Sequence, residues 1–192
     1  MGWYYLQNAV VFLIDTAFGF YILALMLRFL LGLVRADFRN PFAQMLLRAT
    51  SGLLLPLRRI IPGSFGFDWA NFLLMLTLQF IQNTLVAVII GEPYSVVGTV
   101  IQSIAALLGI LIRVFVFSIF LEIAMSWFQA GQNPLEALLY RLNYPLLNPL
   151  RKRLPLVSGI DFSPMVALVV LELLSLLLVL PLQDFGKFLS SG

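Results

Sequence analysis

The 192-residue sequence contains no cysteine and no histidine, and few of its residues carry a charge. Without cysteine there is no disulfide, no thiolate nucleophile and no thiolate metal ligand, and without histidine there is no imidazole base or ligand. Charged residues make up 11% of the chain, less than half of the about 25% that is typical of soluble domains. We therefore expect a protein that is not an enzyme, with no catalytic residues, no cofactor and no metal site.

The sequence is rich in long apolar runs. Hydrophobic residues form 61% of the chain, and the mean hydropathy is +0.98. A helix needs about 20 apolar residues to cross the roughly 30 Å hydrocarbon core of a bilayer. Four runs reach that length: Ala9–Val34, Trp69–Ile90, Val96–Phe128 and Ser163–Leu182. The sequence thus predicts an all-α membrane protein with four transmembrane helices, which has the lipid bilayer as its first partner.

A segment of 29 residues occurs twice, 93 positions apart and without a gap. The first copy runs from Asn40 to Asp68 and the second from Asn133 to Asp161, with 12 identical positions. Each copy stands between two apolar runs, so we predict two tandem repeats of the same orientation, 1–95 and 96–192. The motif residues are Asn40, Pro41, Arg48, Pro56, Arg58, Pro62, Gly66 and Asp68, and Asn133, Pro134, Arg141, Pro149, Arg151, Pro155, Gly159 and Asp161.

The repeat loops, 35–68 and 129–162, each predict an amphipathic helix followed by a basic turn. Both copies begin with Asn-Pro, which is typical of a helix start with asparagine as the cap and proline in the first turn. Apolar residues then follow at the spacing of one helix face, which suits a helix in the headgroup region. These residues are Phe42, Met45, Leu46, Ala49 and Leu53, and Leu135, Leu138, Leu139, Leu142 and Leu146. The prolines that we expect to end the helices are Pro56, Pro145 and Pro149.

Basic residues concentrate in the same two loops. Nine of the 12 Lys and Arg residues lie there, and the short connection Gly91–Ser95 has none. The positive-inside rule then places both loops in the cytoplasm and both termini in the periplasm. The loop arginines can contact anionic lipid headgroups, a partner protein or a specific anion, while Asp68 and Asp161 can cap the next span or pair with an arginine. The basic residues lack interleaved aromatics, so we do not expect a nucleic-acid partner.

Five ionisable residues fall inside the predicted spans: Asp15, Arg28, Arg113, Glu122 and Glu172. A charge near the bilayer centre costs at least about 2.5–3.5 kcal/mol on insertion scales and is usually paired or functional. We expect an ion pair between Arg113 and Glu172, which lie near the middle of their spans. Arg28 and Glu122 are equivalent positions if one residue is deleted before Asn133, so they either face each other or Arg28 reaches the surface. Asp15 has no obvious partner.

The doubled pattern of Asn-Pro, an amphipathic helix, Pro-Leu-Arg, a second proline and Gly-x-Asp before a span resembles the YggT (YlmG) family. The likeness covers about residues 28–73 and 122–166, and the two copies resemble the bacterial members with four spans. It implies a small integral protein of the bacterial inner membrane. Members of the family are associated with cell division and shape, nucleoid distribution, assembly of a c-type cytochrome complex, and osmotic or potassium homeostasis.

Two classes of function remain open from the sequence. The motif density of the loops and the few polar residues of the spans favour a scaffold or assembly factor, with membrane or division proteins as partners. The alternative is a small ion pathway or a modulator of osmotic or potassium homeostasis. It would use the intramembrane charges and the polar residues Gln79, Gln82 and Asn83, whose other role is hydrogen bonding between helices. Four spans rarely enclose a pore, so this alternative requires a homo-oligomer.

Overall fold

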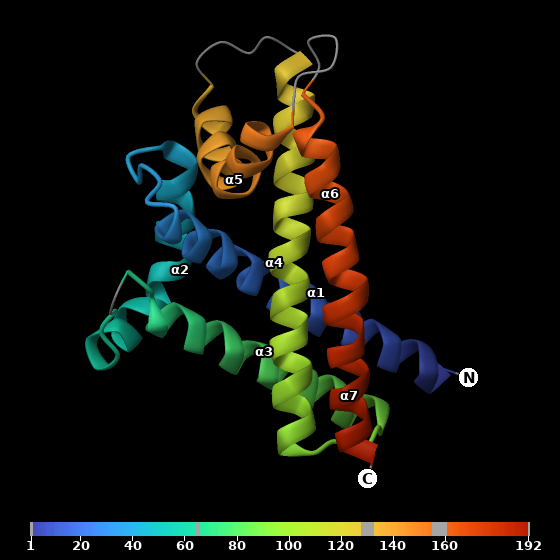
Figure 1. Cartoon of the computed structure of the whole chain (residues 1–192). Helices are drawn as coiled ribbons and strands as arrows, with labels where there is room; N and C mark the ends of the chain where they lie inside the picture. The colour runs from blue at the N-terminus through green and yellow to red at the C-terminus, as the bar shows by residue number, and fades with distance from the viewer. Residues whose placement is uncertain (1, 64–65, 128–132, 155–160, 192) are drawn as a thin grey trace.

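The computed structural model describes residues 2–63, 66–127, 133–154 and 161–191, and every element there is a helix (Figure 1). In the first half the helices are α1 (Gly2–Leu33), α2 (Pro41–Ile60) and α3 (Trp69–Ile90). In the second half they are α4 (Val96–Trp127), α5 (Pro134–Arg153), α6 (Ser163–Leu174), η1 (Ser175–Val179) and α7 (Leu180–Ser191). Both halves therefore follow the same order: a long helix, a hairpin helix and a second long helix.

Four helical segments are long and apolar enough to cross a membrane: Trp3–Leu33, Trp69–Ile90, Val96–Trp127 and Ser163–Ser191. The predicted all-α fold with four apolar spans is confirmed, and it fits a multi-pass membrane protein. α1 and α4 have 32 residues each. At 1.5 Å per residue they are about 48 Å long, which exceeds a core of roughly 30 Å and favours tilting.

The last span is one continuous helix that contains a wide turn. Within η1 the hydrogen bonds reach back five residues, as in the bond from the Leu180 N–H to the Ser175 carbonyl. Pro181 follows directly, and a proline ring crowds the carbonyl four residues before it, here that of Leu177. A widened turn relieves that crowding, so the helix continues beyond the predicted end at Leu182.

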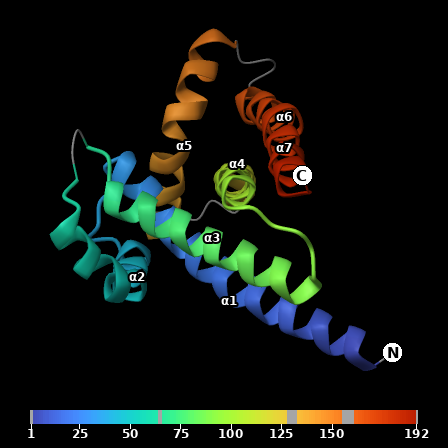
Figure 2. The ribbon, with the colours of Figure 1, turned by 90° about the horizontal axis from the view of Figure 1, so that it is seen from below.

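The long helices form two pairs that cross steeply. α1 packs along α3, and α4 packs along α6, η1 and α7. Figure 2 views α4 and the α6–α7 segment end-on, whereas α1 and α3 are seen lengthwise. The hairpin helices α2 and α5 lie beside these pairs, each next to the long helix that precedes it.

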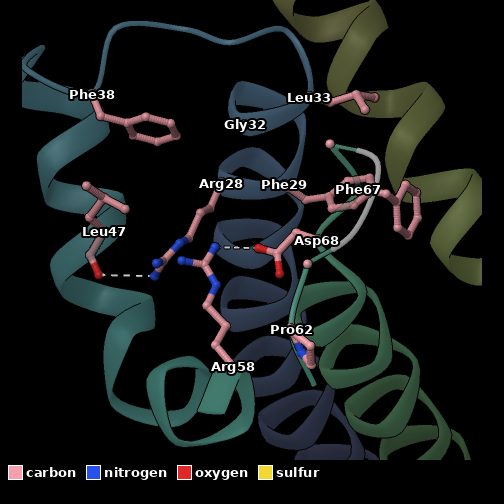
Figure 3. A pocket seen from close by; sticks show the side chains of 12 residues that line it. Arg28, Phe29, Gly32, Leu33, Phe38, Leu47, Arg58, Pro62, Phe67 and Asp68 are labelled. Atoms are coloured by element: carbon pink, nitrogen blue, oxygen red, sulfur yellow. Dashed lines mark hydrogen bonds and ion pairs between the residues drawn. The ribbon is translucent and has the colours of Figure 1, made fainter. Parts of the chain in front are cut away.

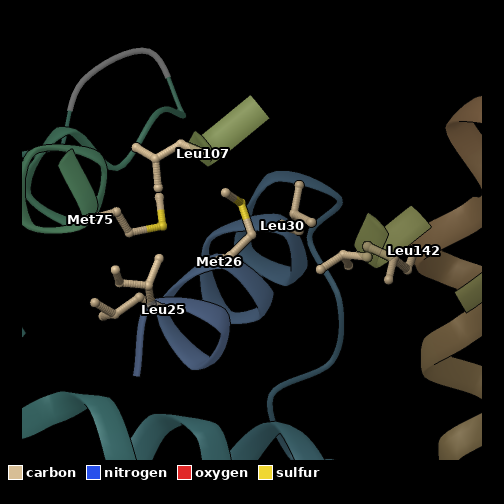
Figure 4. Packing of buried hydrophobic residues seen from close by; sticks show 8 residues of the cluster. Leu25, Met26, Leu30, Met75, Leu107 and Leu142 are labelled. Atoms are coloured by element: carbon tan, nitrogen blue, oxygen red, sulfur yellow. The ribbon is translucent and has the colours of Figure 1, made fainter. Parts of the chain in front are cut away.

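α4 connects the two halves because it contributes to both apolar cores. The first core joins α1, α3 and α4 and includes Leu142 of α5 (Figure 4). The second core joins α4 to α5, α6 and η1, and contains Ile119, Leu147 and Leu171. α5 therefore supplies a buried leucine to each core, which fixes it firmly between the repeats.

The three hairpin prolines do not end their helices, and this prediction was wrong. Pro56 lies inside α2, and Pro145 and Pro149 lie inside α5. Each proline removes one backbone hydrogen bond. A leucine two residues from each proline is fully buried, Leu54 in α2 and Leu147 in α5, so tertiary packing holds the helical path beyond the proline.

α4 and α7 approach each other at a pair of glycines. A Cβ atom at Gly98 would lie 2.6 Å from the Gly186 carbonyl oxygen, and a Cβ at Gly186 would lie 3.0 Å from the Gly98 carbonyl oxygen. Such contacts are too short for any residue with a side chain. The Ser95 hydroxyl donates to the Leu189 carbonyl at 2.8 Å and secures the same crossing.

Replacing Gly98 by alanine should separate α4 from α7. We expect Gly98→Ala to lower the free energy of unfolding by about 1–3 kcal/mol, because the new methyl group meets a backbone carbonyl. Gly109→Ala is the matched control on the same helix, since the nearest atom to its Cβ lies at 3.5 Å. Unfolding titrations with SDS in mixed micelles measure both variants. Equal stability of the two variants would contradict this packing.

Candidate functional site

The hairpin helices begin as the Asn-Pro motif predicts. The Asn40 side-chain oxygen accepts the Phe42 N–H at 3.0 Å, and the Asn133 oxygen accepts the Leu135 N–H at 2.9 Å. A proline follows each asparagine in the first turn, where a helix has no internal partner for its N–H. We call residues 40–68 the first hairpin and residues 133–161 the second hairpin.

The first hairpin is closed by an ion pair between Arg58 and Asp68. Arg58 lies in the last turn of α2, not in a turn after the helix, and a cation there is favourable for the helix dipole. Asp68 also caps α3, since its Oδ1 accepts the Asn71 N–H at 3.2 Å. Both roles considered for this aspartate are thus present together. Gly66, just before it, has a φ of +78°, which explains a glycine at this motif position.

The second hairpin is closed in the same way. The Arg151 Nε donates to Asp161 Oδ2 at 2.8 Å, and the Ser163 N–H donates to Asp161 Oδ1 at 2.9 Å. Burial raises the pKa of the Asp161 carboxyl, but these hydrogen bonds outweigh it and hold the pKa below its ordinary value of 3.8. Burial likewise lowers the pKa of Arg151, yet Asp161 and Glu122 raise it above its usual value.

Arg28 of α1 reaches the first hairpin helix. Its Nη1 donates to Thr50 Oγ1 at 2.7 Å and to Ser51 Oγ at 3.3 Å. It also donates to the Leu47 carbonyl at 3.4 Å (Figure 3). Thr50 is completely buried. The span is thereby tied to α2 by a charged side chain that lies close to Arg58 and Asp68.

Glu122 of α4 reaches the second hairpin helix. It accepts a hydrogen bond from Asn143 Nδ2 at 2.7 Å and pairs with Arg151 at 3.4 Å. Asn143 is completely buried, and its oxygen accepts the Ser118 hydroxyl at 2.6 Å. A charge in the span again meets a buried polar residue of the hairpin helix.

The two arrangements are equivalent in position and opposite in charge. Thr50 and Asn143 are 93 residues apart, as are the two closing arginines and the two aspartates. We define the first-repeat cluster as Arg28, Thr50, Arg58 and Asp68. We define the second-repeat cluster as Glu122, Asn143, Arg151 and Asp161. The first carries two cations and one anion, and the second carries one cation and two anions. The partner on the hairpin helix differs accordingly: the Thr50 hydroxyl accepts from the Arg28 cation, and the Asn143 amide donates to the Glu122 anion.

The predicted ion pair between Arg113 and Glu172 was wrong, and of the two alternatives for Arg28 the pairing with Glu122 is not found. Arg113 makes no ion pair within the described residues: it lines a cavity together with residues of α1, α3, α5 and α7, while Glu172 of α6 is exposed. Arg28 and Glu122 do not face each other, because each turns to the polar partners that its own hairpin helix supplies.

Asp15, for which the sequence suggested no partner, accepts a hydrogen bond from a residue of α3. Gln82 donates to its Oδ1 at 2.9 Å, and Gln79 donates to Gln82 at 3.2 Å and to Asn83 at 3.1 Å. Asn83 then donates to Ser103 at 3.1 Å. This chain of hydrogen bonds links α1, α3 and α4. Across the residues that the structure describes, no group of three or more acidic side chains could hold a metal ion.

The apolar faces of the two hairpin helices are used differently. On α2 the predicted apolar face points outward, and Met45 is 63% exposed. The equivalent residue of α5, Leu138, is 7% exposed and packs against Ala43 and the end of α1. The two hairpins also touch directly, since the Asn40 amide donates to the Pro134 carbonyl at 2.6 Å.

The remaining motif residues are distributed around these contacts. Arg48 is exposed on α2, Pro62 lines a cavity beside the first-repeat cluster, and Arg141 donates to the Val34 carbonyl at 3.3 Å. Pro155 and Gly159 lie outside the described residues. Sequence reasoning missed Thr50 and Asn143, although a polar residue at the same repeat position of both amphipathic helices was a usable signal.

Comparison with known proteins agrees with the repeat. The family model described as CCB3/YggT matches residues 7–89 and 101–182. A protein of Pseudomonas aeruginosa is 39% identical over 179 residues, which cover 91% of this chain and 90% of that protein. The protein of Escherichia coli K12 named YggT is 35% identical over 189 residues, 97% of each chain. A Vibrio alginolyticus protein is 33% identical over 90% of this chain and 94% of its own length. No solved structure matches the chain.

The two closing arginines should differ in their contribution to stability. Among the described residues Arg151 pairs with two carboxylates, those of Asp161 and Glu122, and Arg58 pairs with that of Asp68, so Arg151→Gln leaves two carboxylates without their cation. We expect Arg151→Gln to lower the unfolding free energy by about 1–2 kcal/mol and Arg58→Gln by less than about 1 kcal/mol, since both arginines are about one-third exposed. SDS unfolding titrations compare them, and the reverse order would refute the assignment.

Proposed function

Because the chain belongs to the CCB3/YggT family, we propose that it acts as a non-enzymatic scaffold or assembly factor in the bacterial inner membrane. In this proposal both hairpins face the cytoplasm and both termini face the periplasm, since nine of the 12 basic residues lie in the two loops. The processes that it would serve are cell division and envelope organisation, or the biogenesis of a membrane complex.

The exposed apolar face of α2 is the observation that carries this proposal. Phe42, Met45 and Leu53 are all more than 40% exposed, although they form one continuous face of a well-anchored helix. Exposed apolar patches of this kind mark surfaces that contact another protein or the membrane. The equivalent face of α5 packs against the protein, so among the hairpin residues that the structure describes this face is exposed on α2 and covered on α5.

The second hairpin supports this surface. α5 contributes leucines to both apolar cores and holds the start of α2 through the Asn40–Pro134 hydrogen bond. α2 is therefore presented on a rigid base. A rigid helix face with apolar anchors and nearby arginines suits an apolar helix of a membrane protein that carries acidic residues at the membrane surface.

The alternative class is an ion pathway or a modulator of osmotic or potassium homeostasis. It is supported by the chain of hydrogen bonds from Asp15 to Ser103 and by a cavity of about 660 Å³ that Arg113, Gln79 and Gln82 line. Most of the other residues around that cavity are apolar. The polar groups of the chain also bond to each other across helices, which is the usual structural role of such residues.

Photocrosslinking in cells tests the scaffold proposal directly. A probe at Met45 should give discrete adducts with another membrane protein, and a probe at Leu138, the buried equivalent 93 residues later, should give none. Adding Leu53→Asp should reduce the Met45 adduct about tenfold, because a charge would have to be buried in the interface.

Two results would count against the proposal. The first is a Met45 probe that labels only lipid, which would make α2 a membrane-surface helix without a protein partner. The second is ion flux through the purified protein in liposomes that Asp15→Asn or Arg113→Ala abolishes. That result would favour the ion pathway.

A further inference from the structure

A cavity of about 800 Å³ lies beside the first-repeat cluster, between α1, α2 and the segment that leads into α3. Arg28, Arg58 and Asp68 are its charged lining residues, and Figure 3 shows the two guanidinium groups close to each other. Its volume falls within the roughly 300–1,000 Å³ that is typical of small-molecule sites. The cluster therefore borders a space that can accommodate a ligand group.

Arg28 is the second cation of the first-repeat cluster. It is only 4% exposed, yet none of the ion pairs among the described residues includes it. Its hydrogen bonds to the described part of the chain all leave from Nη1, and its buried Nε has no partner. Burying a charge without an opposite charge costs free energy, and binding an anion would offset that cost. The guanidinium also has N–H donors that are not used by the described residues.

The second-repeat cluster contains one more carboxylate than the first-repeat cluster. There Arg151 contacts two carboxylates, those of Asp161 and Glu122. In the first repeat Arg58 contacts Asp68, while the position of Glu122 is occupied by a second cation, Arg28. The protein thus supplies the second anion itself in one repeat. In the other repeat the same place has a net positive charge and a cavity.

The other residues that line the cavity indicate the chemistry of the rest of the ligand. The cavity also contacts five apolar side chains: Phe29, Leu33, Phe38, Leu47 and Phe67. It lies where α1 ends and the first hairpin begins, which is the level of the headgroups if α1 spans the membrane. An anion with an apolar body attached fits this combination.

We propose that this cavity binds a phosphate group between Arg28 and Arg58, carried by an acidic phospholipid or present as inorganic phosphate. Arginine is the residue best suited to this ligand, because its planar fork of N–H donors matches phosphate oxygens. The site goes beyond the scaffold function and does not depend on it. Loss of phosphate binding would leave the protein contacts of α2 at Met45 untouched.

Binding to the purified full chain in detergent tests the site. The probes are phosphatidylglycerol, phosphatidylcholine as the lipid without net charge, and inorganic phosphate, each followed by native mass spectrometry and thermal stabilisation. Arg28→Gln should weaken binding of the phosphate ligand at least about tenfold, because it removes a charge-assisted contact. Gly32→Leu should do the same while it keeps every charge, since Gly32 lines the cavity and a Cβ there meets no atom within 4 Å.

Arg48→Gln is the matched control. It removes one positive charge from the exposed side of α2, away from the cavity, and should change binding by no more than about twofold. If both Arg28→Gln and Gly32→Leu weaken the binding of phosphatidylglycerol, the cavity is a lipid site. If they weaken the binding of inorganic phosphate alone, it is a site for a free anion. The proposal is overturned if both variants bind like the wild type, or if Arg48→Gln weakens binding as much as Arg28→Gln does. Gly32→Leu keeps the test decisive if Arg28→Gln does not fold.

Discussion

The contact between a charged span residue and a buried polar residue of the hairpin helix is the interaction on which the rest of this structure depends. Arg28 meets Thr50 in the first repeat, and Glu122 meets Asn143 in the second. A charge in an apolar span needs a polar partner, and here the amphipathic helix that follows the span supplies it. The hairpin helix is thereby fixed in rotation, which decides which of its faces is buried and which is free.

The two repeats share this contact, but the charge of the span residue is positive in the first repeat and negative in the second. The negative span residue of the second repeat pairs with Arg151, and α5 packs into the protein core beside it. The positive span residue of the first repeat lies beside a cavity and makes no ion pair among the described residues, and α2 keeps its apolar face outside. The two hairpins thus share one arrangement, and they differ in the charge of the span residue, which is positive for Arg28 and negative for Glu122.

Much of this arrangement could be predicted from the sequence because it is local. The spans follow from the length of the apolar runs, the helix starts from Asn-Pro, and the closing aspartates from their place before a span. The continuation through Pro145 and Pro149 could not be predicted, because it depends on packing of the buried Leu147. The position of Arg113 beside a cavity and the hydrogen bond to Asp15 were missed for a similar reason, since rotation of a helix about its axis is set by its neighbours.

Grafting the polar pair of the first repeat onto the second tests the central claim most directly. Glu122→Arg places a second cation at the second hairpin, Asn143→Thr removes the amide donor, and the double variant reproduces the Arg–Thr pair of the first repeat. If the span charge and its hairpin partner form one unit, the double variant should be more stable than the sum of the single changes predicts, by at least about 1 kcal/mol in a double-mutant cycle. Strict additivity of the two substitutions in SDS unfolding titrations would contradict it.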